Sequence, residues 1–277
     1  MINKSDIQVI NDIQGYISST KDIQTIVEHT VNTWQEDRTE SSKQSDTKLG
    51  KLAEDIFASY IKKNIKNLIY ISYDDFRTDS FEKHAPFDGL VFNDTINLDI
   101  LKEIISHIND EVSSNQWGKI SDELKYKCYK NHIYIVEVKS TRVNARHLDD
   151  NEHIKLDALL EDDFLEYPKY LRIDKYNKIH NFYAYIDFCK KYRSFICHND
   201  CLSKIKEEEK KNMRHIYIRI YINEKEQKAY IIGCISNKTF IQNAIIKKMS
   251  QRNKSEQALY IATSLKNGVH IDNMAKL

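Results

Sequence analysis

The chain has 277 residues, of which 41% are hydrophobic, and a net charge of only +1 at neutral pH. This length and composition allow one large domain with a substantial core, or a core with a small appendage. No apolar run approaches the roughly 20 residues that a helix needs to cross a membrane, which argues against an integral membrane protein. The five cysteines have no regular spacing, which argues against a disulfide framework, so we expect a cytoplasmic protein.

The first part of the chain has an apolar pattern with helical spacing. Isoleucines recur at three- or four-residue intervals: Ile7, Ile10, Ile13 and Ile17. The polar stretch over residues 36–46 is typical of a linker. We therefore predict an N-terminal helical extension over residues 1–45, followed by a main unit over residues 46–277.

The main unit begins with an amphipathic helix and continues with strands and a helix. Apolar runs predict strands at residues 68–73, 87–92 and 133–138. Residues 97–112 carry isoleucines at helical spacing, whereas residues 113–131 are polar and predict a loop.

A β-hairpin is predicted in the C-terminal third. Isoleucine occupies every second position of residues 216–222, and the chain returns over residues 229–235. The isoleucine face should pack on the core, and the opposite face, with Tyr217, Arg219 and Tyr221, should be half-exposed. The hairpin is expected to extend the central sheet. The predicted fold class is therefore α/β (α+β), with a central mixed sheet flanked by helices.

Charged side chains stand at the ends of two predicted strands. Asp88 follows Pro86-Phe87. Glu137 and Lys139 flank Val138 at the end of an apolar run, and because strand residues alternate between faces, these two side chains share one face. A carboxylate and an ammonium group are costly to bury. Their placement predicts a metal ion and a phosphate in front of them.

A third carboxylate is predicted on the helix before the first strand. At about 100° per residue, one face collects the apolar side chains: Leu49, Leu52, Ala53, Ile56, Phe57 and Tyr60. Glu54 lies at the edge of this face, where it can point toward the sheet. Asp55 is expected on the opposite, solvated side with Lys48, Lys51 and Lys62, so Glu54 is the candidate.

These motifs resemble those of the PD-(D/E)xK nuclease superfamily, the fold of type II restriction endonucleases. Pro86-Phe87-Asp88 matches the P-x-D element, and Glu137-Val138-Lys139 matches the E-x-K element. Glu54 matches the carboxylate that the family carries on a preceding helix. The resemblance implies a restriction-endonuclease-like core. The gap between Asp88 and Glu137 is longer than is usual in the family. We interpret residues 97–130 as a helical insertion that accounts for it and that packs against the core or, alternatively, contacts DNA or a second subunit.

The resemblance also implies a Mg²⁺-dependent DNA endonuclease, with Mn²⁺ as a substitute, that leaves 5′-phosphate and 3′-hydroxyl ends. Asp88, Glu137 and the backbone carbonyl of Val138 would bind the metal. Glu54 would hold a second ion or orient water, and Lys139 would position the attacking water. The expected catalytic residues are therefore Glu54, Asp88, Glu137 and Lys139.

The expected substrate is double-stranded DNA, and the expected role is restriction or defence. Such an enzyme is expected to be a homodimer, because a two-fold pair matches a palindrome, and to have a cognate methyltransferase or another defence-system partner. Since the net charge is near zero, local basic groups must bind the phosphates. The candidates for this DNA contact are Arg142, Arg146, Lys190, Lys191 and Arg193.

Two alternatives stay open: a structure-specific nuclease or resolvase of the same fold, and a non-catalytic DNA-binding protein that retains the fold. A zinc site is not favoured, because the spacing of its possible ligands matches no usual pattern: Cys189, Cys197, His198 and Cys201. The acidic segments Asp149-Asp150 and Glu161-Asp162-Asp163 lie in polar surroundings without a predicted strand behind them. We assign them no role.

Overall fold

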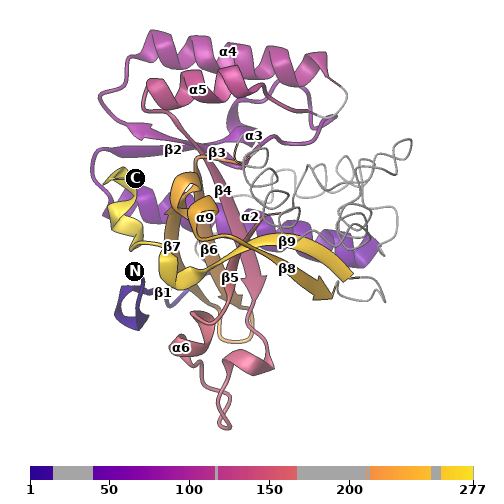
Figure 1. Cartoon of the computed structure of the whole chain (residues 1–277), viewed down its shortest axis with the longest axis vertical. Coiled ribbons are helices and arrows are strands. Elements are labelled where there is room, and N and C mark those ends of the chain that lie inside the picture. Colours follow the sequence, from indigo (N-terminus) through magenta and orange to yellow (C-terminus); the bar gives the residue numbers. More distant parts are fainter. Residues whose placement is uncertain (15–39, 116–117, 167–209, 211–212, 251–256, 277) are drawn as a thin grey trace, which may run out of the picture.

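The computed structural model describes residues 1–14, 40–115, 118–166, 210, 213–250 and 257–276. In this part of the chain, six strands form a curled mixed sheet with helices packed against it (Figure 1). The predicted class, a central mixed sheet flanked by helices, is confirmed. No helix of the described residues is long and apolar enough to cross a membrane.

The main sheet has the strand order β1-β7-β6-β4-β3-β2. Its strands are β1 (Gln8–Ile10), β2 (Leu68–Ser72), β3 (Gly89–Asn93), β4 (Tyr134–Arg142), β6 (Ile216–Asn223) and β7 (Lys228–Ser236). β4 and β6 run parallel, and the other neighbouring pairs are antiparallel. The predicted strands and the predicted hairpin, which extends this sheet, are thus confirmed.

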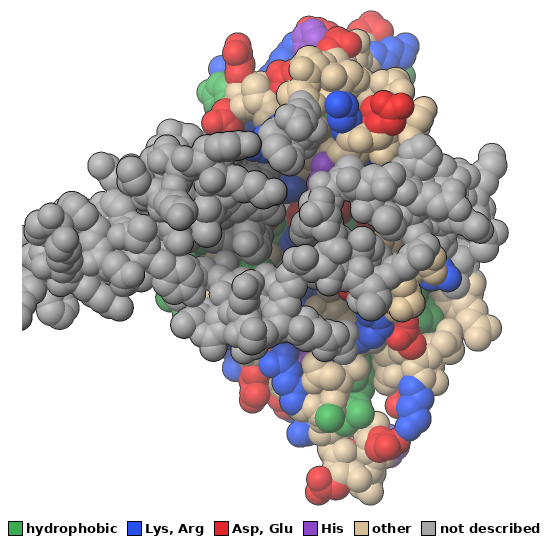
Figure 2. Space-filling model, turned by 90° about the vertical axis from the view of Figure 1, so that its right-hand side faces the viewer, with side chains coloured by type: hydrophobic (Ala, Val, Ile, Leu, Met, Phe, Trp, Pro, Cys, Tyr) green, Lys and Arg blue, Asp and Glu red, His purple; other side chains and the backbone are tan. Residues whose placement is uncertain are grey.

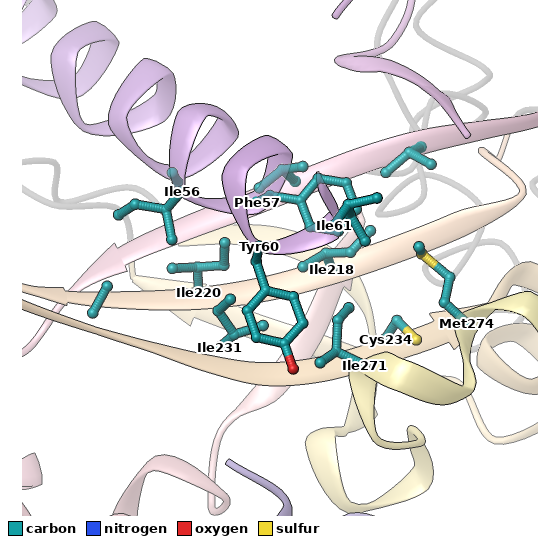
Figure 3. Packing of buried hydrophobic residues seen from close by; sticks show 14 of the residues in the cluster. Ile56, Phe57, Tyr60, Ile61, Ile218, Ile220, Ile231, Cys234, Ile271 and Met274 are labelled. Carbon is teal, nitrogen blue, oxygen red and sulfur yellow. The ribbon is translucent and has the colours of Figure 1, made fainter. Parts of the chain in front are cut away.

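One face of the main sheet is covered by the helix α2 (Glu40–Asn64). Apolar side chains of α2 point at isoleucines of β6 and β7 (Figure 3): Ile56, Phe57, Tyr60 and Ile61 against Ile218, Ile220 and Ile231. Their three- and four-residue spacing forms one stripe along the helix. The predicted packing of the isoleucine face on the core is confirmed, and removal of this surface from water is its main stabilising contribution.

A second, antiparallel sheet has the order β5-β9-β8 and packs over β6 and β7 from the other side. Its strands are β5 (Asp163–Glu166), β8 (Ile245–Ser250) and β9 (Gln257–Ser264). With α9 (Asn237–Gln242) it buries Tyr217 and Tyr221 of β6. Arg219 between them is also buried, so the predicted half-exposed face is wrong. The pattern of a single strand does not reveal that a second sheet will cover it.

Two helices cover the same face of the sheet near β2 and β3: α4 (Leu98–Ser114) and α5 (Asp122–Lys130). The predicted helix at residues 97–112 is confirmed as α4. The loop predicted over residues 113–131 is wrong, because α5 lies within it. α5 buries only Leu124 and Cys128, and so short a stripe on a polar segment gives a weak periodic signal.

The N-terminal segment differs from its prediction. In place of a helix, residues 4–6 form one 3₁₀ turn and β1 pairs with the edge of β7. Pairing with an open strand edge satisfies backbone groups and overrides a helical side-chain pattern in so short a segment. The linker predicted over residues 36–46 is partly wrong, because α2 begins at Glu40. Residues 15–39 lie outside the described part of the chain.

The second face of β4, opposite α2, borders two separate covering layers. Ile133 and Ile135 pack with α4 and α5, whereas the side chains of β6 pack with the small sheet. Glu137 and Lys139 lie between these layers on β4. The remaining short helical segments of the described residues are α3 (Tyr73–Phe76), α6 (Leu156–Leu159), η1 (Lys4–Asp6), η3 (Ala145–His147), η5 (Leu265–Asn267) and η6 (Ile271–Lys276).

Candidate active site

Asp88 lies where the pairing between β3 and β4 ends. The last paired residues are Gly89 and Val136, and the Asp88 N–H donates to the Val136 carbonyl (3.1 Å). Two residues further along β4, the Val138 N–H donates to Oδ2 of Asp88 (2.6 Å). The carboxylate thus takes the place of a strand partner. This hydrogen bond joins the P-x-D motif to the E-x-K motif.

The backbone of Asp88 is held by aromatic residues from β2 and α3. Its carbonyl accepts hydrogen bonds from the Tyr73 N–H (2.9 Å) and from the Tyr70 hydroxyl (3.0 Å). The Tyr70 ring lies over Gly89, where a Cβ would be only 2.4 Å from a ring carbon. A side chain at this position would displace Tyr70. The close approach of Tyr70 therefore explains why a glycine follows Pro86-Phe87-Asp88.

Glu137 and Lys139 point to one face of β4, as predicted, and form an ion pair. Nζ of Lys139 is 2.6 Å from Oε1 of Glu137, and Nε of Arg214 is 2.8 Å from Oε2. Arg214 also lies 3.8 Å from Glu166 of β5. Burial acts to lower the pKa of Lys139, but the charges of Glu137 and Glu166 outweigh it and raise that pKa above its usual range. Lys139 therefore stays charged at neutral pH.

Glu54 reaches the same region from α2. It is buried and pairs with Lys51 (2.8 Å), which in turn lies 2.5 Å from Asp74 of α3. Burial raises the pKa of Glu54 well above its usual range, the Lys51 charge opposes this shift, and the Asp88 charge adds to it. Asp55 is half-buried. The prediction that Lys51 lies on the side of Asp55 is wrong, because Lys51 lies on the side of α2 that carries Glu54 and pairs with it.

Asp88 and Glu137 form a carboxylate pair that a cation would stabilise. Burial and then repulsion from Glu137 raise the pKa of Asp88 to about 7. The Val138 carbonyl lies on the same strand edge as its N–H, because both groups of a strand residue face one neighbour. No three His, Cys, Asp or Glu side chains of the described residues form a metal site by themselves.

The available donors nevertheless fit Mg²⁺. This ion binds through one or two carboxylates together with water and substrate phosphates, and it prefers oxygen ligands. Asp88, Glu137 and the Val138 carbonyl offer such a set. In such a site, Glu137 would share its oxygens with Lys139 and Arg214 or release them to the ion.

Two of the basic residues predicted to contact DNA are held by carboxylates. Nε of Arg142 lies 2.9 Å from Glu224 and its Nη1 lies 3.1 Å from Asp46. Arg146 lies 2.7 Å from Asp162. Figure 2 shows acidic and basic side chains interspersed on the described surface of one side. The other predicted contacts and the zinc candidates lie outside the described residues: Lys190, Lys191, Arg193, Cys189, Cys197, His198 and Cys201.

Several charged residues of this region were not predicted. Lys51 had a sequence signal, since it lies one helical turn before Glu54 and such pairs attract. Arg214 and Glu166 come from distant segments, and only the fold brings them to Glu137. The acidic segment 161–163 was also misjudged, because Asp162 accepts hydrogen bonds and β5 begins directly after it.

No family model, curated protein or solved structure matches this chain. The arrangement of the site itself is therefore the basis on which a function can be assigned. The structure brings Glu54, Asp88, Glu137 and Lys139 into one electrostatically coupled group. Asp88 stands at its centre, with Glu54 approaching from α2 and the other two from β4.

Proposed function

We propose that the chain is a Mg²⁺-dependent DNA endonuclease with a restriction-endonuclease-like fold. The observation that carries this proposal is the hydrogen bond from the Val138 N–H to the Asp88 carboxylate (2.6 Å). It links two motifs that are separated in sequence by α4 and α5. Two chance motif matches would have no reason to meet in this way, with a lysine and a second carboxylate beside them.

The residues have distinct roles in this proposal. Asp88, Glu137 and the Val138 carbonyl would hold Mg²⁺, and Glu54 would orient water or hold a second ion. When bound, the ion neutralises phosphate oxygens and makes a nearby water more acidic. Lys139 positions the attacking water and stabilises the negative charge that develops on phosphorus. In-line attack with the 3′-oxygen as leaving group gives 5′-phosphate and 3′-hydroxyl ends.

Arg214 belongs to the same proposal as a positioning residue. It holds Oε2 of Glu137 (2.8 Å) while Lys139 holds Oε1 (2.6 Å). Two cations on one carboxylate fix its orientation and compensate its charge until a metal ion binds. Arg214 also ties this carboxylate to Glu166 on the small sheet, so the second sheet supports the site.

The test is incubation of the purified protein with plasmid, phage and branched DNA, in Mg²⁺ or in EDTA, beside Lys139→Ala. Discrete Mg²⁺-dependent fragments that are absent with the variant support a restriction or defence enzyme acting on double-stranded DNA. Selective cutting of branched DNA supports a structure-specific nuclease of the same fold. Equal cleavage by wild type and Lys139→Ala contradicts the proposed site.

A further inference from the structure

Arg219 is a buried cation on the second face of the main sheet. β4 and β6 run parallel with Lys139 and Arg219 in register, so both side chains leave the sheet on the same face. Arg219 is 7% exposed, whereas the Lys139 side chain is 34% exposed. Two positive charges therefore lie side by side, and Lys139 is the more exposed of the two.

Arg219 differs from the other buried cations around the site. Each of these forms an ion pair with a carboxylate: Lys51 with Asp74, Arg77 with Asp79, and both Lys139 and Arg214 with Glu137. Within the described residues, Arg219 forms no ion pair with a carboxylate; its guanidinium hydrogen-bonds the Tyr221 side chain, and its buried Nε has no hydrogen-bond partner. A buried cation without a carboxylate partner is costly. Such a group is expected to receive an anion.

The surrounding residues hold Arg219 in one orientation. The guanidinium carbon lies 5.1 Å from the centre of the Tyr221 ring, and the Tyr221 hydroxyl donates to Asp162. The strand register shifts directly after the pair of Arg219 with Gly233, because β7 carries one extra residue there, Ile232. Bulges are common beside functional sites. Arg219 is thus held in place while one of its nitrogens stays unpaired.

From this geometry we infer that Arg219 binds the phosphodiester group next to the scissile one on the DNA strand. The inference rests on the proposed function and adds a substrate contact to it. A guanidinium group offers parallel N–H donors that match a phosphate. Neighbouring strands are about 4.8 Å apart, so Lys139 can face the reacting phosphate while Arg219 holds the adjacent one. Arg219 binds and positions, and it takes no part in proton transfer.

The test compares wild type, Arg219→Gln, Arg219→Lys and the control Lys225→Gln, whose exposed lysine pairs with Glu152. A fluorescein-labelled DNA duplex is titrated with each protein in Ca²⁺, at several salt concentrations. Arg219→Gln should lower the salt slope of the affinity by about 1, as expected for one lost phosphate contact. Arg219→Lys should retain that slope but bind more weakly, and Lys225→Gln should match wild type.

The unfolding temperature separates this role from a structural one. Without DNA, Arg219→Gln should unfold at the same or a higher temperature, because it removes a buried charge that has no carboxylate partner. In millimolar inorganic phosphate, wild type should gain stability that the variant does not gain. A lower unfolding temperature with an unchanged salt slope overturns the inference.

The same experiment distinguishes failure of this inference from failure of the proposed function. An unchanged slope for Arg219→Gln, in a protein that cleaves DNA, overturns the Arg219 contact and leaves the nuclease intact. A changed slope in a protein that never cleaves DNA leaves the contact and overturns the nuclease. Failure of wild type to bind the duplex at any salt concentration overturns both.

Discussion

The two faces of the β4–β6 pair lie on the same strands but are held by different forces. On the α2 side, Val136, Val138 and Ile218 are buried among apolar neighbours. On the other side, Glu137 and Lys139 occupy the alternate positions of β4 and are held by ion pairs. One strand thus carries a core and a site, separated only by the alternation of its side chains.

The difference indicates that the apolar face contributes most of the stability and that the charged face carries the proposed function. Apolar burial stabilises roughly in proportion to the area removed from water, at about 25 cal/mol per Å². Buried ion pairs add little net stability, because desolvation offsets their attraction. A fold selected for stability alone would place apolar residues at positions 137 and 139. We therefore expect substitutions on the charged face to affect activity, and those on the apolar face to affect the free energy of unfolding.

The largest expected effect is on the charged face. Lys139→Ala and Asp88→Ala should each lower the cleavage rate by on the order of 10³ or more, since each removes a group that acts on the reacting phosphate or holds the ion. Circular dichroism and the unfolding temperature should stay close to those of wild type. A cleavage rate within tenfold of wild type for either variant would exclude that residue from the site.

The matching experiment on the apolar face is Ile218→Ala. Ile218 is fully buried under α2, so its truncation should lower the free energy of unfolding by about 2–5 kcal/mol. Cleavage per folded molecule should not change. The control is Ile69→Ala on the edge strand β2, where the side chain is 39% exposed, and denaturant unfolding measures both. Similar losses at the two positions would contradict the importance of the α2 core.

A smaller effect is expected for the two neighbouring carboxylates of α2. Glu54→Gln should lower the cleavage rate by about 10- to 100-fold, as is typical of a residue that supports a metal site. Asp55→Asn should leave the rate within about twofold, because the electrostatic partners Lys51 and Asp88 belong to Glu54. If Asp55→Asn is inactive and Glu54→Gln is active, the assignment on α2 is wrong. Single-turnover cleavage measures both rates.

A pH dependence of stability is also expected, at the edge of the site. His215 is buried, and Nδ1 accepts a hydrogen bond from the Ile135 N–H (3.1 Å). Burial, and then the Lys125 charge, lower the pKa of His215 from 6.5 to about 4. Between these pH values the unfolded chain binds a proton that the folded chain does not bind. Stability from this group is therefore complete above pH 6.5 and is lost as the pH falls to 4.

The measurement is denaturant unfolding of wild type and His215→Gln across this pH range, with the exposed His107→Gln as a control. Gln can still accept the Ile135 hydrogen bond but does not titrate. Wild type should lose about 3 kcal/mol more than His215→Gln on acidification to pH 4. Equal losses in the two proteins would show that His215 titrates normally.

Most of the central sheet and the site motifs could be predicted from the sequence, because both depend on local patterns of residues. Alternating isoleucines predicted β6, and the E-x-K triplet lay at the end of an apolar run. The residues that pair with these motifs could not be predicted from the sequence. Arg214 and Glu166 meet Glu137 only through the small sheet. Likewise, the burial of Tyr217 and Tyr221 depends on residues far along the chain.

Errors in the prediction follow from the same cause. The polar composition of residues 36–46 and 113–131 indicated loops, but exposed helices are equally polar when only one narrow stripe is buried. The isoleucines near the N-terminus fitted a helix, yet β1 gains backbone partners from the open edge of β7. Both outcomes depend on neighbours that a local pattern does not specify.

The most direct test of the central claim is the binding of Mn²⁺, a spectroscopic substitute for Mg²⁺, by electron paramagnetic resonance. Wild type, Asp88→Asn and the control Asp157→Asn, an exposed carboxylate on α6, are titrated with and without duplex DNA. We expect wild type and Asp157→Asn to bind Mn²⁺, more tightly with DNA, and Asp88→Asn to lose this binding. Equal binding by Asp88→Asn, or none by wild type with DNA present, would contradict a metal-dependent site at the end of β3.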